Sequence, residues 1–595
     1  MKPLRVGVWI AISLIVLMSS ACIFGNVTIT ILQTSDVHNH ASGYGPALDY
    51  TPMDTTDKDT VLGGYSRLAA IINKIRKEQA SKHIPVLLFD SGDFFMGTVY
   101  DLTASNPIAL KFFSMMGYDA ITPGNHEFDW SPSGLALLLS NGVAGGFKVP
   151  VVASNMIVPE GNVLQGLVNT GVIVNKKVIE FPYGGKVGIL GLMGNDSDTK
   201  APVAAPVTFN HDYAAIQQQV DDLKTNDCAQ MVIVLSHGGA EKDGTGEDAD
   251  LAANVNGIDV ICSGHFHTAT QDAIVKGPSN TIIFSPGEYG EYLSRLDVTY
   301  NIFLRKVVDY KFTLIPVDDK VKGDPTIQAM VDQYNAGINA QLSAANLPSM
   351  KDPVSSTTFA LEKASLTVTG IGSLAADSLR AVANQLKALN DGNPYQIGVV
   401  ASGVIRDDIY PGKTGAVTFS DVYNMLPLGI SPNDQSVPGY PLMSVYATGL
   451  DVYTICEVGL SLSQMMGSDY YLNFSGLKID YDPLQAATFS GVQAVYVHDP
   501  ADTFCAGPTT LIDPYDPSTL YHIVVDLYAL QMLNVVNSYG FSITPLDVSF
   551  IDRDPATGVQ EIKEWMAPLN FLPALGGSIP AAVYGPGGIA MGRVY

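Results

Sequence analysis

The sequence predicts an α/β domain followed by a second domain of helices and strands, and three observations support this fold class. Short runs rich in Val and Ile alternate with helical patterns from residue 27 to about residue 315. A polar, helix-like stretch then interrupts the alternation, and helices and strands resume after it. The chain has 595 residues, of which 47% are hydrophobic and 15% charged. This length is typical of two domains, and the composition is typical of a folded globular protein rather than a disordered one.

The expected strands of the first domain are short apolar runs that end in Gly, Ser, Asn or Asp. They occupy residues 27–36, 84–93, 119–128, 149–156, 186–195, 230–239, 258–267 and 281–290. Between some of them apolar residues recur at three- and four-residue steps, which predicts amphipathic helices at residues 66–81 and 212–227. Because the strands are nearly continuous apolar runs, we expect them to be largely buried. Together these elements define the first domain, residues 27–316.

The rest of the chain divides into a connector and a second domain. Residues 317–355 are polar and rich in Ala and Gln, with a helical pattern between Pro325 and Pro348. We interpret them as an interdomain helix or linker. Residues 356–595 mix helices and strands and form the second, α+β domain. The last stretch, residues 575–595, is rich in Gly and Pro and is expected to be irregular.

The N-terminus, residues 1–26, has the pattern of a signal peptide. Lys2 and Arg5 precede an apolar run over residues 6–18, and small residues follow it before Cys22. The run is shorter than the roughly 20 residues that span a bilayer. We therefore expect an exported protein that is periplasmic or lies at the cell surface or outside the cell. A lipid on Cys22, or an uncleaved signal, would instead hold the chain at a membrane.

Composition also limits the partners and the cross-links. The net charge is −25, and this field repels nucleic-acid phosphates, so a nucleic-acid polymer is excluded as a partner. A small phosphorylated substrate would need local cations, from metals or arginines, to offset the charge. Export permits disulfides, so Cys456 and Cys505 could pair, and buried free thiols are the alternative.

Polar side chains collect at the ends of the expected strands. The stretches TSDVHNH, SGDFF, GNHEFD, LSHGG and SGHFH contribute this set: Asp36, His38, Asp93, Asn125, His126, Glu127, Asp129, His237, His265 and His267. Strand ends on one edge of an α/β sheet converge in space, where such folds place their sites. Any one of these residues alone would more often be a turn, cap or core residue. The chain has only ten histidines, however, and half of them belong to this set, which packing does not explain.

The mixture of carboxylate, imidazole and amide groups favours borderline divalent metals such as Zn²⁺, Mn²⁺ or Fe²⁺. A structural zinc site would favour cysteines, and the CxxC spacing is absent from the sequence. The candidates outnumber the ligands of one four-coordinate ion, and a carboxylate shared between two ions resolves the excess. Two ions about 3.5–4 Å apart can hold a hydroxide and clamp a phosphoryl group.

These motifs, in this order, resemble those of the calcineurin-like metallophosphoesterases. LQTSDVHNH, LGGYSRLAAII, GDFFMGT, GNHEFD, SHGG and GHFH are similar to the 5′-nucleotidase family within that group. The resemblance covers the chain from about residue 28 to the late C-terminal region. It implies a first domain built as a sandwich of two mixed sheets flanked by helices, followed by a substrate-binding C-terminal domain that rotates relative to the metal centre.

The resemblance also implies a role for each polar residue. The implied ligands of two divalent ions are Asp36, His38 and His267 for the first, Asn125, His237 and His265 for the second, and Asp93 as the bridge. His126 would contact the phosphate and stabilise or protonate the departing oxygen, and Asp129 would orient His126. A metal-bound hydroxide would attack phosphorus. His267 stands where several nucleotidase relatives carry Gln or Asn, and it matches the wider phosphoesterase pattern.

The second half departs from the family pattern where the nucleotide base is held. Arg406 in ASGVIRDDI matches the substrate-binding arginine, with an ordinary exposed arginine as the alternative. Ala401 occupies an asparagine position, and Leu428 stands where a phenylalanine stacks on the base. Phe541, or the nearby Tyr539, could supply the other stacking face, with core packing as the alternative. Losing a stacking ring costs on the order of 1 kcal/mol or more.

We therefore expect an exported two-metal phosphoesterase that hydrolyses phosphomonoesters, with nucleotides as the leading substrate class. Two alternatives remain open. The same centre could act on a cyclic nucleotide, a sugar nucleotide or a sulfate-thiol ester, because residues that hold the nucleotide base in the family are replaced in this chain. The chain could also be a surface binding protein with a residual metal site, although all seven ligand positions carry suitable side chains.

Overall fold

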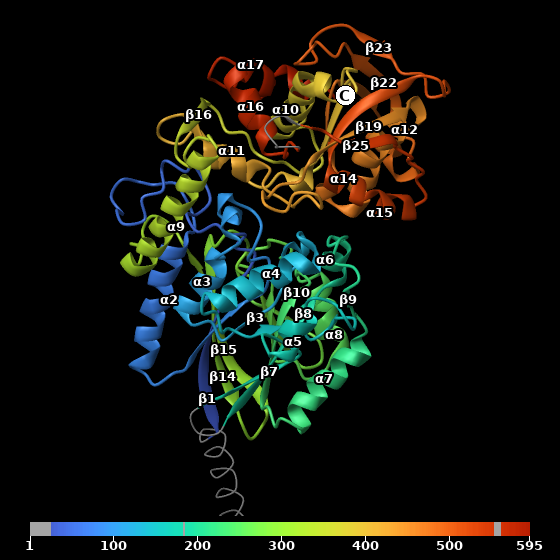
Figure 1. Cartoon of the computed structure of the whole chain (residues 1–595). Helices are drawn as coiled ribbons and strands as arrows, with labels where there is room; N and C mark the ends of the chain where they lie inside the picture. Colours follow the sequence, from blue (N-terminus) through green and yellow to red (C-terminus); the bar gives the residue numbers. More distant parts are fainter. Residues whose placement is uncertain (1–24, 182–184, 553–560) are drawn as a thin grey trace, which may run out of the picture.

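A computed structural model describes residues 25–181, 185–552 and 561–595. Figure 1 shows two bodies, an N-terminal domain that holds β1 to β15 and a C-terminal domain above it, with helix α9 running along one side. The expected signal peptide lies almost entirely outside the described residues. Within them, no helix combines the length and apolarity that crossing a membrane requires.

The first sheet of the N-terminal domain is mixed. In spatial order its strands are β15 (Lys306–Pro316), β14 (Tyr292–Asn301), β1 (Asn26–Thr34), β2 (Val86–Asp90), β3 (Ala120–Ile121), β4 (Val151–Val152) and β6 (Ile173–Val174). Strands β1, β2, β3, β4 and β6 run parallel, and β14 is antiparallel to β1 on one side and β15 on the other. The parallel strands bring their carboxyl ends to one edge.

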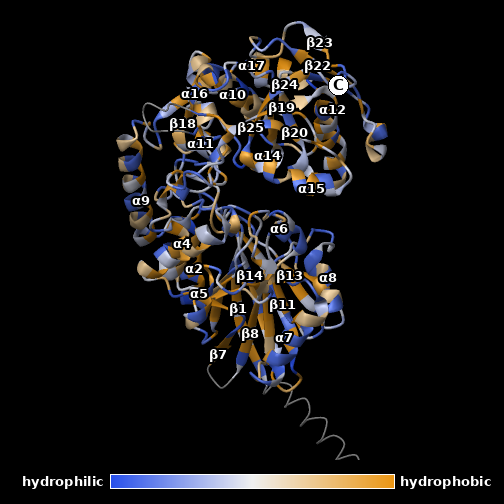
Figure 2. Ribbon diagram, turned by 45° about the vertical axis from the view of Figure 1, so that its right-hand side comes forward, coloured by the Kyte–Doolittle hydropathy of each residue, from blue (hydrophilic) through white to orange (hydrophobic). Residues whose placement is uncertain are grey.

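The second sheet is also mixed, with a parallel centre and antiparallel edges. Its strands in order are β12 (Ile274–Lys276), β13 (Thr281–Phe284), β11 (Val260–Ser263), β10 (Met231–His237), β8 (Lys186–Met193) and β7 (Lys177–Glu180). Side chains of both sheets, such as Ile31, Phe89, Ile233 and Cys262, form one buried cluster. The two sheets therefore pack face to face, and Figure 2 shows their strands as a predominantly apolar layer.

Helices cover the outer faces of this sandwich. They are α2 (Tyr65–Ala80), α3 (Ile108–Met116), α4 (Ser131–Ala144), α5 (Gln165–Asn169), α6 (Asn195–Thr199), α7 (Tyr213–Thr225) and α8 (Glu247–Asn254), with a short strand pair β5 (Met156–Ile157) and β9 (Thr208–Phe209). Leu68 and Ile72 of α2 pack with Leu32 and Leu88 of the first sheet. The predicted sandwich of two mixed sheets flanked by helices is confirmed.

Helix α9 (Pro325–Ala344) follows β15 and precedes the C-terminal domain. The Asp324 side chain accepts hydrogen bonds from the backbone N–H groups of Thr326 and Ile327 and so caps the helix. Ile327, Val331 and other apolar residues of α9 are buried. The connector is therefore an ordered, packed helix rather than a loose strand of chain.

The C-terminal domain is built on a five-stranded sheet. Its order is β20 (Leu472–Ser475), β17 (Ile397–Ala401), β24 (Leu520–Asp526), β19 (Leu442–Thr448) and β25 (Leu546–Phe550). A three-stranded sheet, β21 (Leu477–Tyr481), β22 (Val492–His498) and β23 (Thr509–Leu511), and a two-stranded one, β16 (Pro353–Ser356) and β18 (Ala416–Thr418), accompany it. The expected second α+β domain is thus present.

Helices lie on both faces of the five-stranded sheet. They are α10 (Gly370–Leu386), α11 (Phe419–Met425), α12 (Gly449–Glu457), α13 (Ser463–Met466), α14 (Leu527–Gln531), α15 (Leu533–Ser538), α16 (Met566–Ala574) and α17 (Ala581–Tyr584). Val400 of β17 packs in one buried cluster with α10, and Val399 packs in another with α12. The Gly- and Pro-rich tail contains two short helical turns, and its Arg593 forms a buried ion pair with Asp377.

The cysteines of the described residues are all free thiols: Cys228, Cys262, Cys456 and Cys505. The pairing of Cys456 with Cys505 that the sequence allowed is therefore absent from the structure. Cys456 packs in the apolar core beside β17 and β19, while the sulfur of Cys505 accepts a hydrogen bond from the Gly476 backbone N–H at 3.0 Å. The alternative of buried thiols holds for both.

The C-terminal domain rests on the strand-end edge of the N-terminal domain. His40 contacts Asp407 at 2.9 Å, and the Trp130 indole donates to the Gly429 carbonyl at 3.0 Å. A further contact links the Val99 N–H to Asn424 at 3.0 Å. These bonds close the two domains around the edge where the predicted polar residues lie.

Candidate metal centre and substrate pocket

The predicted ligands lie just beyond the ends of β1, β2, β3 and β11, and His237 is the last residue of β10. Five of these residues hold left-handed backbone: Asp36 (φ 52°), His38 (φ 43°), Asp93 (φ 53°), His265 (φ 76°) and His267 (φ 55°). Residues other than glycine rarely adopt this conformation. Backbone hydrogen bonds maintain it, including Asp36 N–H to Gly92 O and His38 N–H to Asp93 O, both 2.9 Å. The strand ends are thereby bent so that their side chains converge.

One cluster contains Asp36, His38 and His267, whose candidate ligand atoms all lie within 4.8 Å of one another. The Nε2 atoms of His38 and His267 are 3.3 Å apart. His267 Nε2 also lies 3.5 Å from Asp36 Oδ1. Asp36 and His38 are fully buried. The two imidazole nitrogens and the carboxylate oxygen therefore surround one candidate position for a metal ion.

A second cluster contains Asp93, His237 and His265, again with ligand atoms within 4.8 Å. His237 Nε2 lies 3.0 Å from Asp93 Oδ2 and 3.2 Å from Asn125 Oδ1. The same Asp93 oxygen is 3.8 Å from His38 Nε2 in the first cluster. Asp93 thus has a carboxylate oxygen within 4 Å of an imidazole nitrogen of each cluster.

The tautomers of His38 and His237 fit metal ligation. The Nδ1–H group of His38 donates to the Met96 carbonyl at 2.7 Å, and that of His237 donates to the Ser91 carbonyl at 2.7 Å. A backbone partner on Nδ1 leaves the Nε2 lone pair aimed at the cluster. Metal-ligating histidines are usually held by such a second hydrogen bond.

The other two imidazoles are held by carboxylates. His267 pairs through Nδ1 with Glu288, which leaves Nε2 toward the first cluster. His265 pairs through Nε2 with Asp196 Oδ2 at 2.8 Å, which leaves Nδ1 for the second cluster. The sequence interpretation did not single out Glu288 or Asp196. Glu288 could have been noticed, because it lies near the end of the expected strand at residues 281–290, whereas Asp196 gives no such signal.

The protonation of the imidazoles follows from their surroundings. Burial, together with the Arg406 guanidinium, holds the pKa of His38 well below its ordinary value, and burial lowers the pKa of His265 to about 4. Burial also acts to lower the pKa of His237, but the Asp93 carboxylate outweighs it and raises that pKa to about 10. The Asp93–His237 contact therefore stabilises positive charge, which a proton on His237 Nε2 supplies and which a bound metal ion would supply in its place.

His126 and Asp129 form a hydrogen-bonded pair beside Asp93. The Nδ1–H of His126 donates to Asp129 Oδ2 at 2.7 Å, and the His126 backbone N–H donates to Asp93 Oδ1 at 2.9 Å. Glu127, between them, accepts hydrogen bonds from the backbone N–H groups of Asp93, Gly124 and Phe95 at 2.6–2.9 Å and so orders the turn. The imidazole is left free to face the pocket.

Arg406 reaches, from the C-terminal domain, the strand-end edge that carries both candidate clusters, called here the metal-binding edge. Its Nη2 donates to His38 Nε2 at 3.1 Å, and its carbonyl accepts from the Tyr289 hydroxyl at 3.4 Å. The neighbouring Asp407 and Asp408 contact His40 and Tyr44, at 2.9 and 2.8 Å. The loop that carries Arg406 is thereby fixed to the N-terminal domain at three successive residues.

A pocket runs from these groups into the C-terminal domain. Asn125, His126, Asp129, Lys200 and Arg406 line it together with Leu428, Tyr440, Tyr470, Tyr528 and a set of aliphatic side chains. Lys200 pairs with Asp469 at 2.9 Å across the domain boundary. The sequence interpretation missed Lys200, Asp469 and the three tyrosines, because they come from separate stretches with no shared motif.

The structure does not bring Phe541 to this pocket. Its ring packs edge-to-face on Phe489 with centroids 5.0 Å apart, at the outside of a small apolar cluster. Tyr539 is exposed. The aromatic side chains that do line the pocket are Tyr440, Tyr470 and Tyr528. In this conformation the core-packing alternative describes Phe541.

The fold and the paired clusters define a class, the calcineurin-like phosphoesterases, whose family model matches residues 29–269. Residues 340–533 match the model described as 5′-nucleotidase, C-terminal domain. With both domains in this order, the chain belongs to the 5′-nucleotidase family.

The relatives agree with this assignment at low identity. The trifunctional nucleotide phosphoesterase protein YfkN of Bacillus subtilis is 28% identical over 451 residues, which cover 71% of this chain and 29% of that protein. This chain thus spans less than a third of that relative. The 5′-nucleotidase of Rattus norvegicus is 24% identical over 525 residues, covering 84% of this chain and 82% of its own.

Two solved structures share the whole fold. A 5′-nucleotidase precursor from Thermus thermophilus superposes with a TM-score of 0.71 at 22% identity, covering 95% of this chain and 99% of its own. A sulfate thiohydrolase, SoxB, superposes with a TM-score of 0.64 at 18% identity, covering 93% and 94%. Because enzymes acting on different esters share this fold, the superpositions do not select a substrate.

Proposed function

We propose that this protein is a metal-dependent hydrolase of phosphomonoesters. The observation that carries the proposal is the position of Asp93, which contacts both ligand clusters and the backbone of His126. Around it lie two clusters of candidate ligands, a His–Asp pair and an arginine. This combination supports phosphoryl-group binding and leaving-group protonation at one place.

The ligands would divide into two sets around Asp93. Asp36, His38 and His267 would hold one ion, and Asn125, His237 and His265 the other. Oxygen and imidazole donors of this kind suit Zn²⁺, Mn²⁺ or Fe²⁺. When bound, such ions supply Lewis acidity and lower the pKa of a bound water, which gives a nucleophile at neutral pH.

The remaining residues act on the substrate itself. The Arg406 guanidinium would bind the phosphate oxygens through charge-assisted hydrogen bonds. His126 would donate a proton to the alcohol oxygen as the P–O ester bond breaks and the oxygen of water bonds to phosphorus. Asp129 keeps the His126 ring oriented through its 2.7 Å hydrogen bond. The products are the free alcohol and inorganic phosphate.

Nucleotides are the first substrates to test, because several relatives are named as nucleotidases or nucleotide phosphoesterases. The residues that would hold a nucleotide base nevertheless differ from the family pattern, since Leu428 and Ala401 stand in the pocket wall where that pattern has phenylalanine and asparagine. The site therefore supports the general class, a phosphomonoester, without selecting a nucleoside as the leaving group. We also propose that residues 27–316 bind the metals and that residues 356–595 bind the leaving group.

Phosphate release tests the proposal. The purified chain is incubated with chelator, then with Zn²⁺, Mn²⁺ or Fe²⁺, and phosphate is measured for nucleotides, sugar phosphates and simple alkyl phosphates. We expect turnover only with metal, and about two ions per chain by elemental analysis. Full metal occupancy without turnover of any ester would contradict the proposal and would favour a binding protein.

Export is a separate proposal that the N-terminal sequence supports. We expect the mature protein, recovered outside the cytoplasm, to lack the leader before about residue 26. The intact mass measures this cleavage, and an added acyl mass on Cys22 would identify a lipid anchor. Recovery of the full-length chain from the cytoplasm would contradict export.

A further inference from the structure

The pocket beside His126 continues into an apolar cavity inside the C-terminal domain. The whole pocket, polar end included, has a volume of about 150 Å³, and its apolar part, the cavity, lies between the five-stranded sheet and helices α12, α14 and α15. Its walls include Val399 of β17, Ala447 of β19 and Ile523 of β24. Since protein interiors are normally close-packed, a cavity of this size next to a candidate active site needs an explanation.

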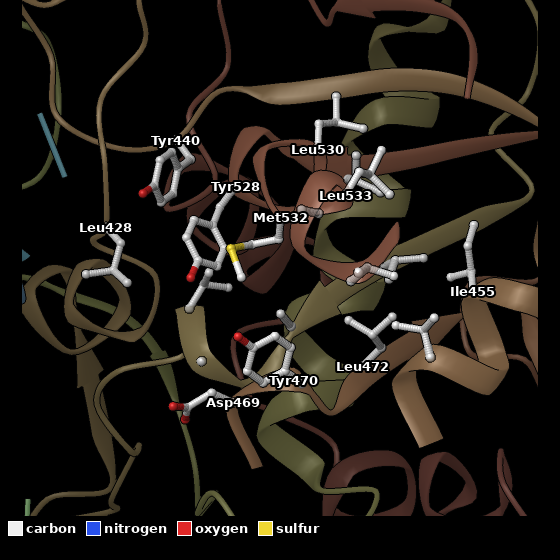
Figure 3. A pocket seen from close by; sticks show the side chains of 18 of the residues that line it. Leu428, Tyr440, Ile455, Asp469, Tyr470, Leu472, Tyr528, Leu530, Met532 and Leu533 are labelled. Carbon is white, nitrogen blue, oxygen red and sulfur yellow. The ribbon is translucent and has the colours of Figure 1, made fainter. Parts of the chain in front are cut away.

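Polarity changes along the cavity. Figure 3 shows Asp469 and the hydroxyl oxygens of Tyr440, Tyr470 and Tyr528 toward one end, while Ile455, Leu472, Leu530 and Leu533 surround the other. The charged side chains of the described lining are Asp129, Lys200, Arg406 and Asp469, together with His126 when protonated. They belong to the end that meets the metal-binding edge. The other end offers hydrocarbon alone.

This polarity matches a ligand with a charged head and an apolar tail. An apolar cavity of about 150 Å³ in another protein holds benzene, which sets the scale at about six carbon atoms. A nucleobase in the inner part would leave its ring nitrogens and exocyclic groups without partners, which is costly for buried polar groups. An aliphatic chain would leave nothing unpaired there.

A second observation concerns the polar end. The Tyr470 hydroxyl is buried and has no hydrogen-bond partner among the described residues. Tyr470 lines the same cavity. A buried hydroxyl without a partner is costly unless a ligand satisfies it. An oxygen of a substrate alcohol or phosphate, seated between this hydroxyl and Arg406, would do so.

We propose that the preferred substrate is the phosphomonoester of an amphiphilic alcohol, with an aliphatic chain of about six carbons or more in this cavity. The phosphate lies at Arg406 and the metal-binding edge, and the chain extends past the tyrosines. The inference rests on the proposed function and names its substrate class. Hydrolysis breaks the P–O bond to this alcohol, adds the elements of water and releases the alcohol and phosphate.

A chain-length series tests the inference with the metal-loaded protein. We expect kcat/KM for n-alkyl phosphates to rise about threefold to fourfold per methylene from ethyl to about hexyl or octyl, then to level off. Adenosine monophosphate and glycerol phosphate should fall below octyl phosphate. A flat series, or a clear preference for the nucleotide, would overturn the inference while leaving the proposed function intact.

A filling variant locates the effect in the cavity. Ala447 is buried in the cavity wall, and Ala447→Leu adds bulk there. We expect kcat/KM for octyl phosphate to fall at least tenfold and that for ethyl phosphate to change less than twofold. Ala487→Leu, on the exposed helical turn at Pro483–Thr488, is the matched control and should leave both unchanged. An equal loss for both substrates in Ala447→Leu, with an unchanged melting temperature, would contradict the placement.

Product binding separates failure of the cavity from failure of catalysis. Calorimetric titration with 1-octanol requires no turnover. We expect binding to the wild-type chain and at least tenfold weaker binding to Ala447→Leu. If no ester is hydrolysed but octanol binds in this pattern, the proposed reaction is wrong and the apolar site stands. If octanol does not bind to the wild type, the apolar site is wrong whatever the activity.

Discussion

The metal-binding edge and the cavity behind it differ in how their residues are held. At the edge, each ligand side chain has a defined hydrogen-bond partner, as His237 has with the Ser91 carbonyl at 2.7 Å. In the cavity, aliphatic side chains line the inner part of a pocket of about 150 Å³ and offer no directional contact. The first region can fix the chemistry of one reacting group, whereas the second can select only by size and polarity.

This difference predicts how each region responds to change. A side chain that binds through directional bonds loses its function when its binding atom is replaced by another element, even if the size of the side chain is kept. A cavity wall tolerates changes of identity and responds to volume. Variants at the edge should therefore act on every substrate alike, and variants in the cavity should act according to the leaving group.

The largest effect is expected at Asp93. Asp93→Asn keeps the size but removes the charge that both clusters share, so we expect activity to fall by about 10³-fold or more for every ester and metal content to drop. Steady-state kinetics and elemental analysis measure the two losses. Full activity at full metal occupancy would contradict this prediction, because the edge would then tolerate a change of charge.

His126 comes next. His126→Ala should lower kcat by about 10²–10⁴-fold for alkyl phosphates, whose leaving oxygen needs a proton. For 4-nitrophenyl phosphate the loss should be far smaller, because that leaving group departs without protonation. His211→Ala is the matched control, since His211 also pairs with an aspartate, Asp198, at 3.0 Å. Equal losses with both leaving groups would contradict the acid role.

Arg406 is expected to affect binding more than the chemical step. Arg406→Lys keeps the charge but removes the forked donor geometry, and we expect KM to rise about tenfold or more, with a larger rise in Arg406→Ala. Arg305→Ala, in the exposed turn between β14 and β15, is the control. An unchanged KM for every phosphate ester would show that Arg406 only supports the domain contact.

The smallest effect is expected at Lys200, which pairs with Asp469 at 2.9 Å while the Asp469 side chain is 54% exposed. Exposed pairs contribute about 0.2–1 kcal/mol. Lys200→Met should therefore change kcat/KM less than about fivefold, and added salt should shrink the difference. Lys320→Met, which breaks a comparable exposed pair with Asp318, is the control. A loss of tenfold or more would place Lys200 in contact with the substrate.

The sequence predicted the site best where the functional residues stand directly at the ends of strands. The positions of Asp36, Asp93 and His237 relative to β1, β2 and β10 could be anticipated, because parallel strands bring their carboxyl ends to one edge. The family and the two-sheet sandwich were predicted and are confirmed. The partners Asp196 and Glu288 were not predicted, since they contact imidazoles only after separate segments fold together.

The cavity could not be predicted from the sequence, for a physical reason. A cavity is the volume that packed side chains leave over, and it depends on how β17, β19 and β24 face α12, α14 and α15. Val399, Ala447 and Ile523 read individually as ordinary core residues. The expected aromatic contact from Phe541 did not appear in the pocket for the same reason, because its ring packs on Phe489 instead.

The left-handed backbone at Asp36, His38, Asp93, His265 and His267 has a consequence for laboratory evolution. Each such residue destabilises the fold by about 1 kcal/mol or more relative to glycine, which adopts this conformation freely. Selection for heat resistance alone should therefore favour glycine at these positions. Glycines gained at these five positions would remove metal-ligand side chains, so greater heat resistance would be reached at the expense of the metal centre.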